Sequence, residues 1–189
     1  MHLFLVGATG GTGAAIRDQA PRRGHRVTAF GRSEANDVVG SPLDAAVLAE
    51  RAKGHDAVLS AIGAGLFPTT VRTDSARAIL DAMQRSGIRR FIVMSSTLNE
   101  ASLRARILSH TLLWAPAKDQ RAMEKIVSAS DADWTIIRPP MLTNGPLTGD
   151  ARLADTNTGR SSVSRADVAR LMLELAESGS HLRQVVWVA

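Results

Sequence analysis

A glycine-rich turn near the start of the chain constrains its fold more than any other feature. The apolar run Leu3–Val6 leads into Gly7, Gly10 and Gly13, which are spaced three residues apart and precede a helix-like stretch. Glycines at such positions allow a sharp turn off a strand, close approach of a pyrophosphate to the backbone and tight packing of the next helix. The first N–H groups of that helix and its partial positive charge favour an anion. The pattern predicts a dinucleotide-binding loop, with an ordinary tight turn as the alternative. The predicted cofactor-binding residues of this loop are Gly7, Thr9, Gly10, Gly11, Thr12 and Gly13.

Strand-like and helix-like segments alternate along the chain. Predicted strands cover Leu3–Val6, Arg26–Phe30, Asp37–Val39, Ala57–Ala61, Phe91–Met94, Trp134–Ile137 and Val185–Val188. Predicted helices cover Gly11–Arg22, Leu43–Arg51, Thr73–Arg85, Lys118–Ala129 and Ala166–Ala176. This alternation favours a parallel sheet covered by helices on both faces, and right-handed crossovers make that sheet doubly wound. With 189 residues and no visible linker, the chain is predicted to form one α/β domain over residues 1–189, with its ligand at the carboxyl ends of the strands.

The end of the second predicted strand bears on which dinucleotide is bound. Chains that bind NAD usually place Asp or Glu there to contact the ribose hydroxyls, whereas this chain has Gly31, Arg32 and Ser33. A guanidinium and a hydroxyl suit a 2′-phosphate, so Arg32 and Ser33 are predicted to favour NADPH over NADH. The alternative is that Arg32 is simply an exposed arginine at a strand end. Ile62 and Gly63 follow the fourth strand and are predicted to flank the cofactor, although a simple turn would also explain Gly63.

Two residue pairs follow the strands beside which a nicotinamide is expected to lie. Ser95 and Ser96 come after Phe91–Met94, where hydroxyls can bond a carboxamide or a substrate carbonyl. Both are predicted as catalytic residues, with Ser95 also contacting the cofactor and Ser96 the substrate; simple strand caps are the alternative. Residues after the strand Trp134–Ile137 are predicted to close the nicotinamide site, and Met141 also to contact the substrate. They are Pro139, Pro140, Met141 and Leu142.

The stretch of residues 95–116 is the longest without a clear helix or strand pattern. It is interpreted either as a lid over the ligand cleft or as a surface helix. Trp114 lies in this stretch and is predicted to bind the substrate.

Two residue types are missing from the chain: it has no Cys and no Tyr. Without Cys there are no disulfides, no thiol catalysis and no thiolate metal sites, and no metal site of another kind is predicted. Without Tyr the chain lacks the Tyr-x-x-x-Lys pair with which many reductases of this shape protonate a substrate oxygen. A proton must therefore come from water, from another side chain or from the substrate.

The net charge of +5 arises from 23 basic and 18 acidic residues. It indicates either a solvated basic surface or attraction of polyanionic small molecules such as NADPH. Nucleic-acid binding is disfavoured, because no dense Lys/Arg run occurs and only 4% of residues are aromatic. No window approaches the roughly 20 apolar residues that cross a bilayer, and the N-terminus lacks the features of a secretory signal. We expect a cytoplasmic monomer that binds a small-molecule acceptor and neither nucleic acid nor membrane.

Four segments together carry a more specific signal. They are Gly7–Gly13, Phe67–Val71 with the helix that follows it, Ser95–Ser96, and Pro139–Pro140 continuing through Gly145–Gly149. They resemble the NADPH-dependent flavin reductase and biliverdin IXβ reductase family, one of the atypical short-chain dehydrogenases related to the NmrA group. The Pro-Thr-Thr-Val and Pro-Leu-Thr-Gly pieces are the specific ones, since the glycine motif is shared with a far larger group.

This resemblance implies a single-domain Rossmann fold that uses NADPH to reduce flavins, or linear tetrapyrroles, in a shallow cleft. By position, the resemblance implies that Gly10, Thr12 and Gly13 bind the pyrophosphate and that Arg32 binds the 2′-phosphate. It implies that Gly63 flanks the cofactor. Lining of the nicotinamide site is implied for Ser95 and Ser96, and closure of that site for Pro140 to Leu142. The chain departs from the family at two places. Met141 stands where vertebrate members have a histidine, which puts a proton-donor role there in doubt. Gly40, Ser41 and Pro42 replace a Gly-Asp pair, which removes a carboxylate near the adenine end.

The sequence therefore predicts hydride transfer from NADPH to a flavin (FMN, FAD or riboflavin) or a similar flat conjugated acceptor. Such an acceptor delocalises the developing negative charge, so the protein contributes mainly proximity and orientation. The alternative is a non-catalytic NADP(H)-binding redox sensor that controls a partner protein, which Met141 motivates. A sugar-nucleotide epimerase is disfavoured, because such enzymes need a tyrosine and a larger C-terminal substrate lobe.

Overall fold

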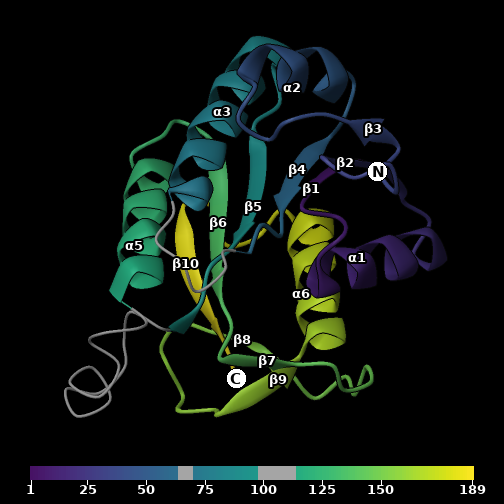
Figure 1. The fold of residues 1–189 in the computed structure, drawn as a ribbon. Coiled ribbons are helices and arrows are strands. Elements are labelled where there is room, and N and C mark those ends of the chain that lie inside the picture. The colour runs from purple at the N-terminus through teal and green to yellow at the C-terminus, as the bar shows by residue number, and fades with distance from the viewer. Residues whose placement is uncertain (64–69, 98–113) are drawn as a thin grey trace.

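Eight strands form one sheet, in the order β3-β2-β1-β4-β5-β6-β10-β8, in a computed structural model that describes residues 1–63, 70–97 and 114–189. Every neighbouring pair runs parallel except β10 and β8, which are antiparallel. The predicted α/β fold, a doubly wound and mainly parallel sheet in a single domain, is confirmed (Figure 1).

The strands and helices lie close to their predicted ranges. The strands are β1 His2–Val6, β2 Arg26–Gly31, β3 Val38–Val39, β4 Ala57–Ser60, β5 Arg90–Met94, β6 Asp133–Arg138, β7 Met141–Thr143, β8 Leu153–Ala154, β9 Ser162–Ser164 and β10 Gln184–Val188. The helices are α1 Gly11–Arg22, α2 Ala45–Ala52, α3 Val71–Ser86, α5 Trp114–Ser128 and α6 Arg165–Ser178.

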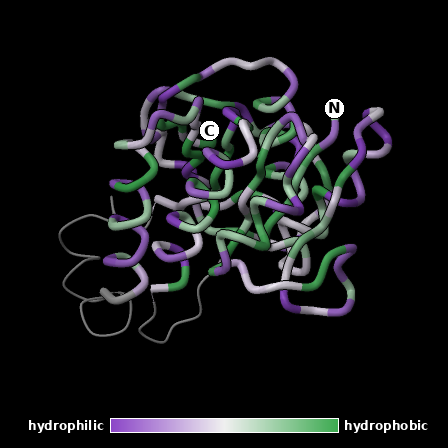
Figure 2. Tube along the Cα trace, turned by 90° about the horizontal axis from the view of Figure 1, so that it is seen from above, coloured by the Kyte–Doolittle hydropathy of each residue, from purple (hydrophilic) through white to green (hydrophobic). Residues whose placement is uncertain are grey.

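Helices cover both faces of the sheet because side chains alternate along each buried strand. In β1, Leu3 and Leu5 face α1 and α6, whereas Phe4 and Val6 face the layer of α2, α3 and α5. Both sets are almost fully buried, so the continuous apolar run Leu3–Val6 supplies two cores. Figure 1 shows the two helix layers, and Figure 2 shows hydrophobic segments gathered along the strands inside the molecule.

The direction in which the chain adds strands reverses at β1. This strand pairs with β2 on one side, where Leu3 lies opposite Val27, and with β4 on the other, where Leu3 lies opposite Ala57. A crevice forms at the carboxyl ends of strands where such a reversal occurs, and doubly wound proteins bind ligands there. The glycine turn after β1 opens onto this crevice.

Three short strands differ from the prediction. Residues Met141–Thr143 were expected to belong to a loop, but they form β7, which pairs in parallel with β9 in a second, two-stranded sheet. The pair Leu153–Ala154 forms β8 at the sheet edge. The two-residue β3 was predicted, but β7, β8 and β9 contain too little alternation to be recognised in the sequence, and pairing with distant partners defines them.

Candidate functional site

The turn after β1 requires glycine at its first and last positions. Gly7 has a φ of +88°, in the left-handed region, and a Cβ on it would lie 2.8 Å from the carbonyl carbon of Ala61. A Cβ on Gly13 would lie 2.7 Å from the Cα of Ala8. Both collisions involve backbone atoms, so neither can be relieved by a side-chain rotation. The sharp turn and the close packing of the helix are thus confirmed at these two residues.

The N-terminus of α1 has unused hydrogen-bond donors. The first helical N–H with a backbone acceptor is that of Ala14, which donates to the Gly10 carbonyl at 2.8 Å. No hydrogen bond is recorded for the N–H groups of Gly11, Thr12 or Gly13 within the described part of the chain, and no side chain caps this helix. A Cβ on Gly10 would collide with nothing, because it would make only van der Waals contacts with the carbonyl oxygens of Gly7 at 3.5 Å and Ala61 at 3.9 Å. These amides and the positive helix end fit an anion such as a pyrophosphate.

The end of β4 lies beside this turn. Ala61 follows β4 and contacts the position of a Gly7 Cβ, while the side chain of Ile62 packs against the core on the α2–α3 face. A Cβ on Gly63 would meet no atom within 4 Å. The structure therefore brings Ile62 and Gly63 to the crevice, and contact of either with a cofactor stays a prediction.

At the end of β2, Arg32 is exposed and has no recorded hydrogen bond or ion pair with the rest of the described chain. The Ser33 hydroxyl accepts from the N–H of Ala35 at 3.2 Å, so its own hydrogen stays available to a ligand. Asn36 is buried and leaves its Oδ1 without a partner. A carboxylate in the same turn, Asp37, accepts from the N–H of Ala29 at 2.7 Å. The Arg32 guanidinium, which has no recorded partner in the described chain, and the neighbouring Ser33 hydroxyl fit a phosphate. The amide of Asn36 does not contribute a donor, because its Nδ2 donates to the Ser33 carbonyl and its Oδ1 is an acceptor.

The paired serines after β5 are already engaged by α5. Ser95 is buried, and its hydroxyl donates to Glu124. The Ser96 hydroxyl donates to Gln120 Oε1 at 2.7 Å, and Gln120 Nε2 donates to the Ser96 carbonyl at 2.7 Å. Both hydroxyls therefore donate to side chains of α5, whereas the sequence predicted that they would face a carboxamide or a substrate carbonyl. A catalytic role for either serine stays a prediction.

Glu124 joins the serine to a buried cation. Arg138, at the end of β6, donates to Glu124 through Nη2 at 2.6 Å and through Nε at 3.0 Å. The exposed fractions of the two side chains are only 18% and 10%, so water screens this pair weakly. The guanidinium carbon also lies 5.1 Å from the ring centre of Trp187 on β10. The network fixes the carboxyl ends of β5, β6 and β10 relative to α5.

The proline pair and the residues after it occupy three different environments. Pro139 and Pro140 are buried, and the Pro139 carbonyl accepts from the N–H of Thr97. Met141 has 70% of its surface exposed. Leu142 packs against the core on the α1–α6 face. Of the residues expected to close the nicotinamide site, Met141 thus offers an apolar surface to a ligand, while Leu142 anchors β7.

The Pro-Leu-Thr-Gly piece is held by a buried carboxylate. Asp167 accepts from the N–H of Gly149 at 2.8 Å and from the Thr148 hydroxyl at 2.9 Å. Burial acts to raise the pKa of Asp167, but hydrogen bonds from Ser164, Gly149 and Thr148 outweigh it and lower the pKa below its usual value. This motif therefore has a structural role, which is to fix the segment after β7 to α6.

Trp114 begins α5, and its side chain lies outside the described structure. Residues 98–113, which make up most of the possible lid, also lie outside the described residues. The alternatives of a lid and a surface helix stay open.

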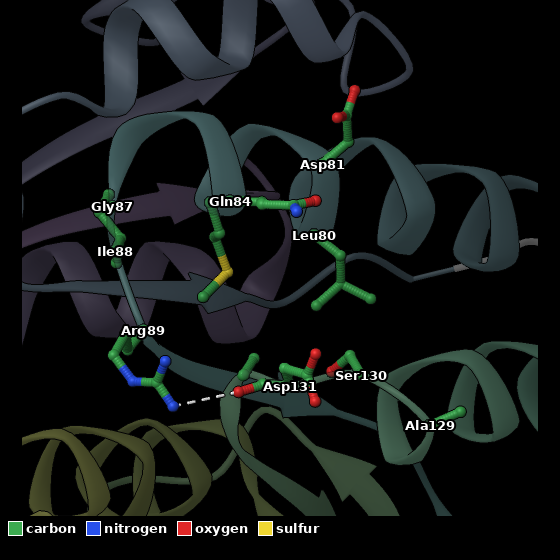
Figure 3. Close-up of a pocket in the computed structure, with 11 residues that line it drawn as sticks. Leu80, Asp81, Gln84, Gly87, Ile88, Arg89, Ala129, Ser130 and Asp131 are labelled. Atoms are coloured by element: carbon green, nitrogen blue, oxygen red, sulfur yellow. Dashed lines mark hydrogen bonds between the residues drawn. The ribbon is translucent and has the colours of Figure 1, made fainter.

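A separate hollow lies at the opposite end of the strands, beside the amino ends of β5 and β6. It has a volume of about 580 Å³ and lies between the C-terminal ends of α3 and α5 (Figure 3). Arg89, just before β5, crosses it to the carbonyl of Asp131 at 3.2 Å. It contains none of the predicted site residues. In the described ranges no group of His, Asp or Glu is suited to hold a metal ion, and no helix there is long and apolar enough to cross a membrane.

Sequence reasoning missed three residues beside the site: Gln120, Glu124 and Arg165. Arg165 is the first residue of α6, and its side chain lies against Gly11. A signal existed for the first two, because residues four apart on a helix share one face. Nothing in the sequence linked that face to the serines 24 and 29 residues earlier.

Comparison with known proteins agrees with this geometry. A family model described as NAD(P)H-binding matches residues 7–178, and the chain belongs to that family. The Bacillus subtilis protein named uncharacterized sugar epimerase YhfK is 28% identical, over 92% of this chain and 86% of its own length.

Solved structures show the same fold. ChuY of Escherichia coli O157:H7, named an anaerobilin reductase, is 25% identical with a TM-score of 0.81, covering 100% of this chain and 96% of ChuY. A short-chain dehydrogenase/reductase of Veillonella parvula, solved in complex with NADP, has a TM-score of 0.82 at 18% identity, covering 100% of this chain and 94% of that one. The narrower likeness to biliverdin IXβ reductases stays a prediction.

Proposed function

We propose that this member of the NAD(P)H-binding family is an NADPH-dependent reductase that delivers a hydride to a flavin or a similar flat conjugated acceptor. The observation that carries the proposal is that the crevice has two sets of hydrogen-bond donors suited to anions. They are the N–H groups of Gly11 to Gly13 at the start of α1 and the guanidinium of Arg32 after β2, none of which has a recorded partner among residues 1–63, 70–97 and 114–189. The first group suits a pyrophosphate and the second a 2′-phosphate, which are the features of NADPH.

The chain's own residues would bind and orient rather than transfer protons. When bound, the nicotinamide supplies a hydride. Ser95 and Ser96 are fixed by Glu124 and Gln120, so they hold their end of the crevice in one shape. The exposed Met141 offers an apolar surface on which a flat ring system can lie. An acceptor that spreads negative charge over its rings needs little acid catalysis, which suits a chain with no tyrosine.

The test measures NADPH oxidation by the purified chain with FMN, FAD, riboflavin and a linear tetrapyrrole. Stimulation by one of these acceptors, at a rate well above their uncatalysed reduction, is the expected result. Arg32→Ala should weaken NADPH binding by about tenfold to a hundredfold and leave NADH binding unchanged, because one charge-assisted contact contributes about 1.5–3 kcal/mol. Equal affinities of the unaltered chain for NADPH and NADH would contradict the cofactor assignment.

A second candidate is a non-catalytic NADP(H)-binding sensor. It is favoured by the commitment of both serine hydroxyl hydrogens to α5, which leaves neither free to donate to a substrate. It predicts tight NADPH binding, no turnover with any acceptor and a partner protein that co-purifies. The epimerase name of the Bacillus relative suggests a third assay, with nucleotide sugars, although this chain has no tyrosine to act on a sugar hydroxyl.

A further inference from the structure

We propose that Arg165 is a second anion-binding group of the cofactor site, which contacts the pyrophosphate from the side of α6. The proposal rests on the proposed function, because it assigns one more residue to the same NADPH site. It also implies that the β7–β9 segment, to which Arg165 is hydrogen-bonded, helps to position a cofactor-binding residue.

The first argument is position. Arg165 is the first residue of α6, which packs beside α1 on the same face of the sheet (Figure 1). Its stem lies across the start of α1, since a Cβ on Gly11 would be 2.5 Å from Arg165 Cδ and 2.9 Å from its Nε. Gly11 is also the first of the residues whose N–H groups have no recorded acceptor in the part of the chain that the structure describes. The guanidinium therefore lies next to the amides that fit a pyrophosphate.

The second argument is charge. Arg165 makes no ion pair within the described residues, whereas Arg170, one turn later on the same helix, pairs with Glu174. A helix N-terminus carries partial positive charge, so a cation there is unfavourable unless an anion is present. Arg165 lies at the N-terminus of α6 and against that of α1. The first turn of α6 already contains a carboxylate, that of Asp167, whereas the first turn of α1 contains no acidic residue. An anion bound at the start of α1 would therefore compensate both that helix end and Arg165.

The third argument is preorganisation. Arg165 Nη1 donates to Asn144 Oδ1 at 2.7 Å and more weakly to the Leu142 carbonyl at 3.4 Å. These bonds fix the plane of the guanidinium from the β7 side. Its Nε and Nη2 have no recorded partner in the described part of the chain, and they are the nitrogens that can form a fork to two phosphate oxygens.

A purely structural role would make Arg165 only a tie between α6 and β7. The two roles differ in which ligand they affect. Adenosine 2′-monophosphate carries the 2′-phosphate of NADP but no pyrophosphate, so it reports on Arg32 and not on Arg165. NADP carries both groups.

The experiment titrates NADP and adenosine 2′-monophosphate into the unaltered chain, Arg165→Gln and Arg152→Gln, by calorimetry and ligand-observed NMR, with thermal unfolding alongside. Arg152 is exposed near the edge strand β8, so its variant controls for the loss of one positive charge. We expect Arg165→Gln to weaken NADP at least tenfold and adenosine 2′-monophosphate less than twofold, with no change for Arg152→Gln. If Arg165→Gln does not fold, Arg165→Lys is expected to bind NADP about three- to tenfold more weakly, since it keeps the charge without the fork.

Two results would overturn the inference and leave the proposed function standing: unchanged NADP affinity in Arg165→Gln, or equal weakening of both ligands. Failure of the unaltered chain to bind NADP would overturn the proposed function as well.

Discussion

The two ends of the proposed cofactor site use their polar groups in opposite ways. At the start of α1, the N–H groups of Gly11, Thr12 and Gly13 have no recorded partner in the described chain. At the end of β5, the hydroxyls of Ser95 and Ser96 already donate to α5. One end is open to a ligand, and the other has satisfied its donors internally.

This difference separates binding from chemistry. The open end consists of backbone groups that glycine leaves accessible, so an anion can occupy it without breaking any bond within the protein. At the closed end, a ligand that took a hydroxyl hydrogen would have to displace Glu124 or Gln120. We infer that the closed end contributes fixed shape and dipoles, which favours an acceptor that needs orientation more than proton transfer.

The largest effect is expected where the open end is filled. Gly10→Val places a side chain in the space above the free amides, where no protein atom lies within 3.5 Å of the Cβ. NADP binding should fall at least about a thousandfold, the equivalent of roughly 4 kcal/mol, because the pyrophosphate and the side chain cannot occupy the same space. The free energy of unfolding should change by less than about 1 kcal/mol. Calorimetric titration and chemical denaturation measure the two quantities.

Gly13→Ala is the matched comparison. Its Cβ would lie 2.7 Å from the Cα of Ala8, so the turn itself must move. Binding should be lost together with about 1–3 kcal/mol of stability. If both glycine variants lose binding without any loss of stability, the distinction between a ligand space and a packing contact is wrong.

The next largest effect, on the free energy of unfolding, is expected at the closed end, where Ser95 and Ser96 donate to α5. Glu124→Gln keeps the volume of the side chain but removes the carboxylate that Arg138 and Ser95 share. We expect a loss of about 3 kcal/mol in the free energy of unfolding, because breaking a buried ion pair leaves a charge without its counter-charge. Urea denaturation measures it. Glu174→Gln is the control, since Glu174 is 38% exposed in its pair with Arg170 and should cost less than about 1 kcal/mol.

The same contrast explains how much of the fold could be predicted. Strands β1, β4 and β5 each contain an uninterrupted apolar run of three or four residues between glycines or polar residues, so their positions and parallel pairing follow from local pattern. The strands β7, β8 and β9 have two or three residues each and exist because distant segments pair with them. No local signal marks such strands.

The candidate site likewise has a part that local sequence predicted and a part that only tertiary packing brings together. The glycine turn was predictable because the requirement at Gly7 and Gly13 is local: a positive φ in one case and a backbone approach in the other. The engagement of Ser95 and Ser96 was not, because their partners lie 29 and 24 residues later, beyond a stretch with no clear pattern. Arg165 is more than 150 residues from the loop that it contacts, and only the packing of α6 on α1 brings it there.

A smaller effect on stability is expected at the C-terminal end of α1, where charged side chains pair with Glu177 of α6. Arg23 donates to Glu177 at 2.7 Å, and this hydrogen bond, together with one from His25, lowers the pKa of Glu177 from 4.5 to about 2. Because the folded pKa is the lower one, the stabilisation is complete above pH 4.5 and is lost as the pH falls toward 2. Since Glu177 is partly exposed, we expect it to contribute only about 1–2 kcal/mol.

Denaturation curves between pH 2 and 7 measure this contribution. In Glu177→Gln the fall in stability over the acid range should be shallower than in the unaltered chain. Asp18→Asn, which removes a fully solvated pair with Arg22, should leave the curve unchanged. Parallel curves for the unaltered chain and Glu177→Gln would show that this contact does not stabilise the packing of α1 on α6.

The smallest effect is expected for Ser96→Ala, and it tests whether the closed end acts in the reaction. The substitution leaves Gln120, which is fully buried, without one donor, so stability should fall by about 1 kcal/mol. Gln120→Ala removes the same bond, and the double variant should therefore lose less than the sum of the two single losses. If the fixed hydroxyl dipole contacts the reacting groups, Ser96→Ala should lower kcat with an acceptor up to about tenfold while the Kd for NADPH stays within about twofold. An unchanged kcat would reduce Ser96 to a link between β5 and α5, and the open end alone would then account for what this site does.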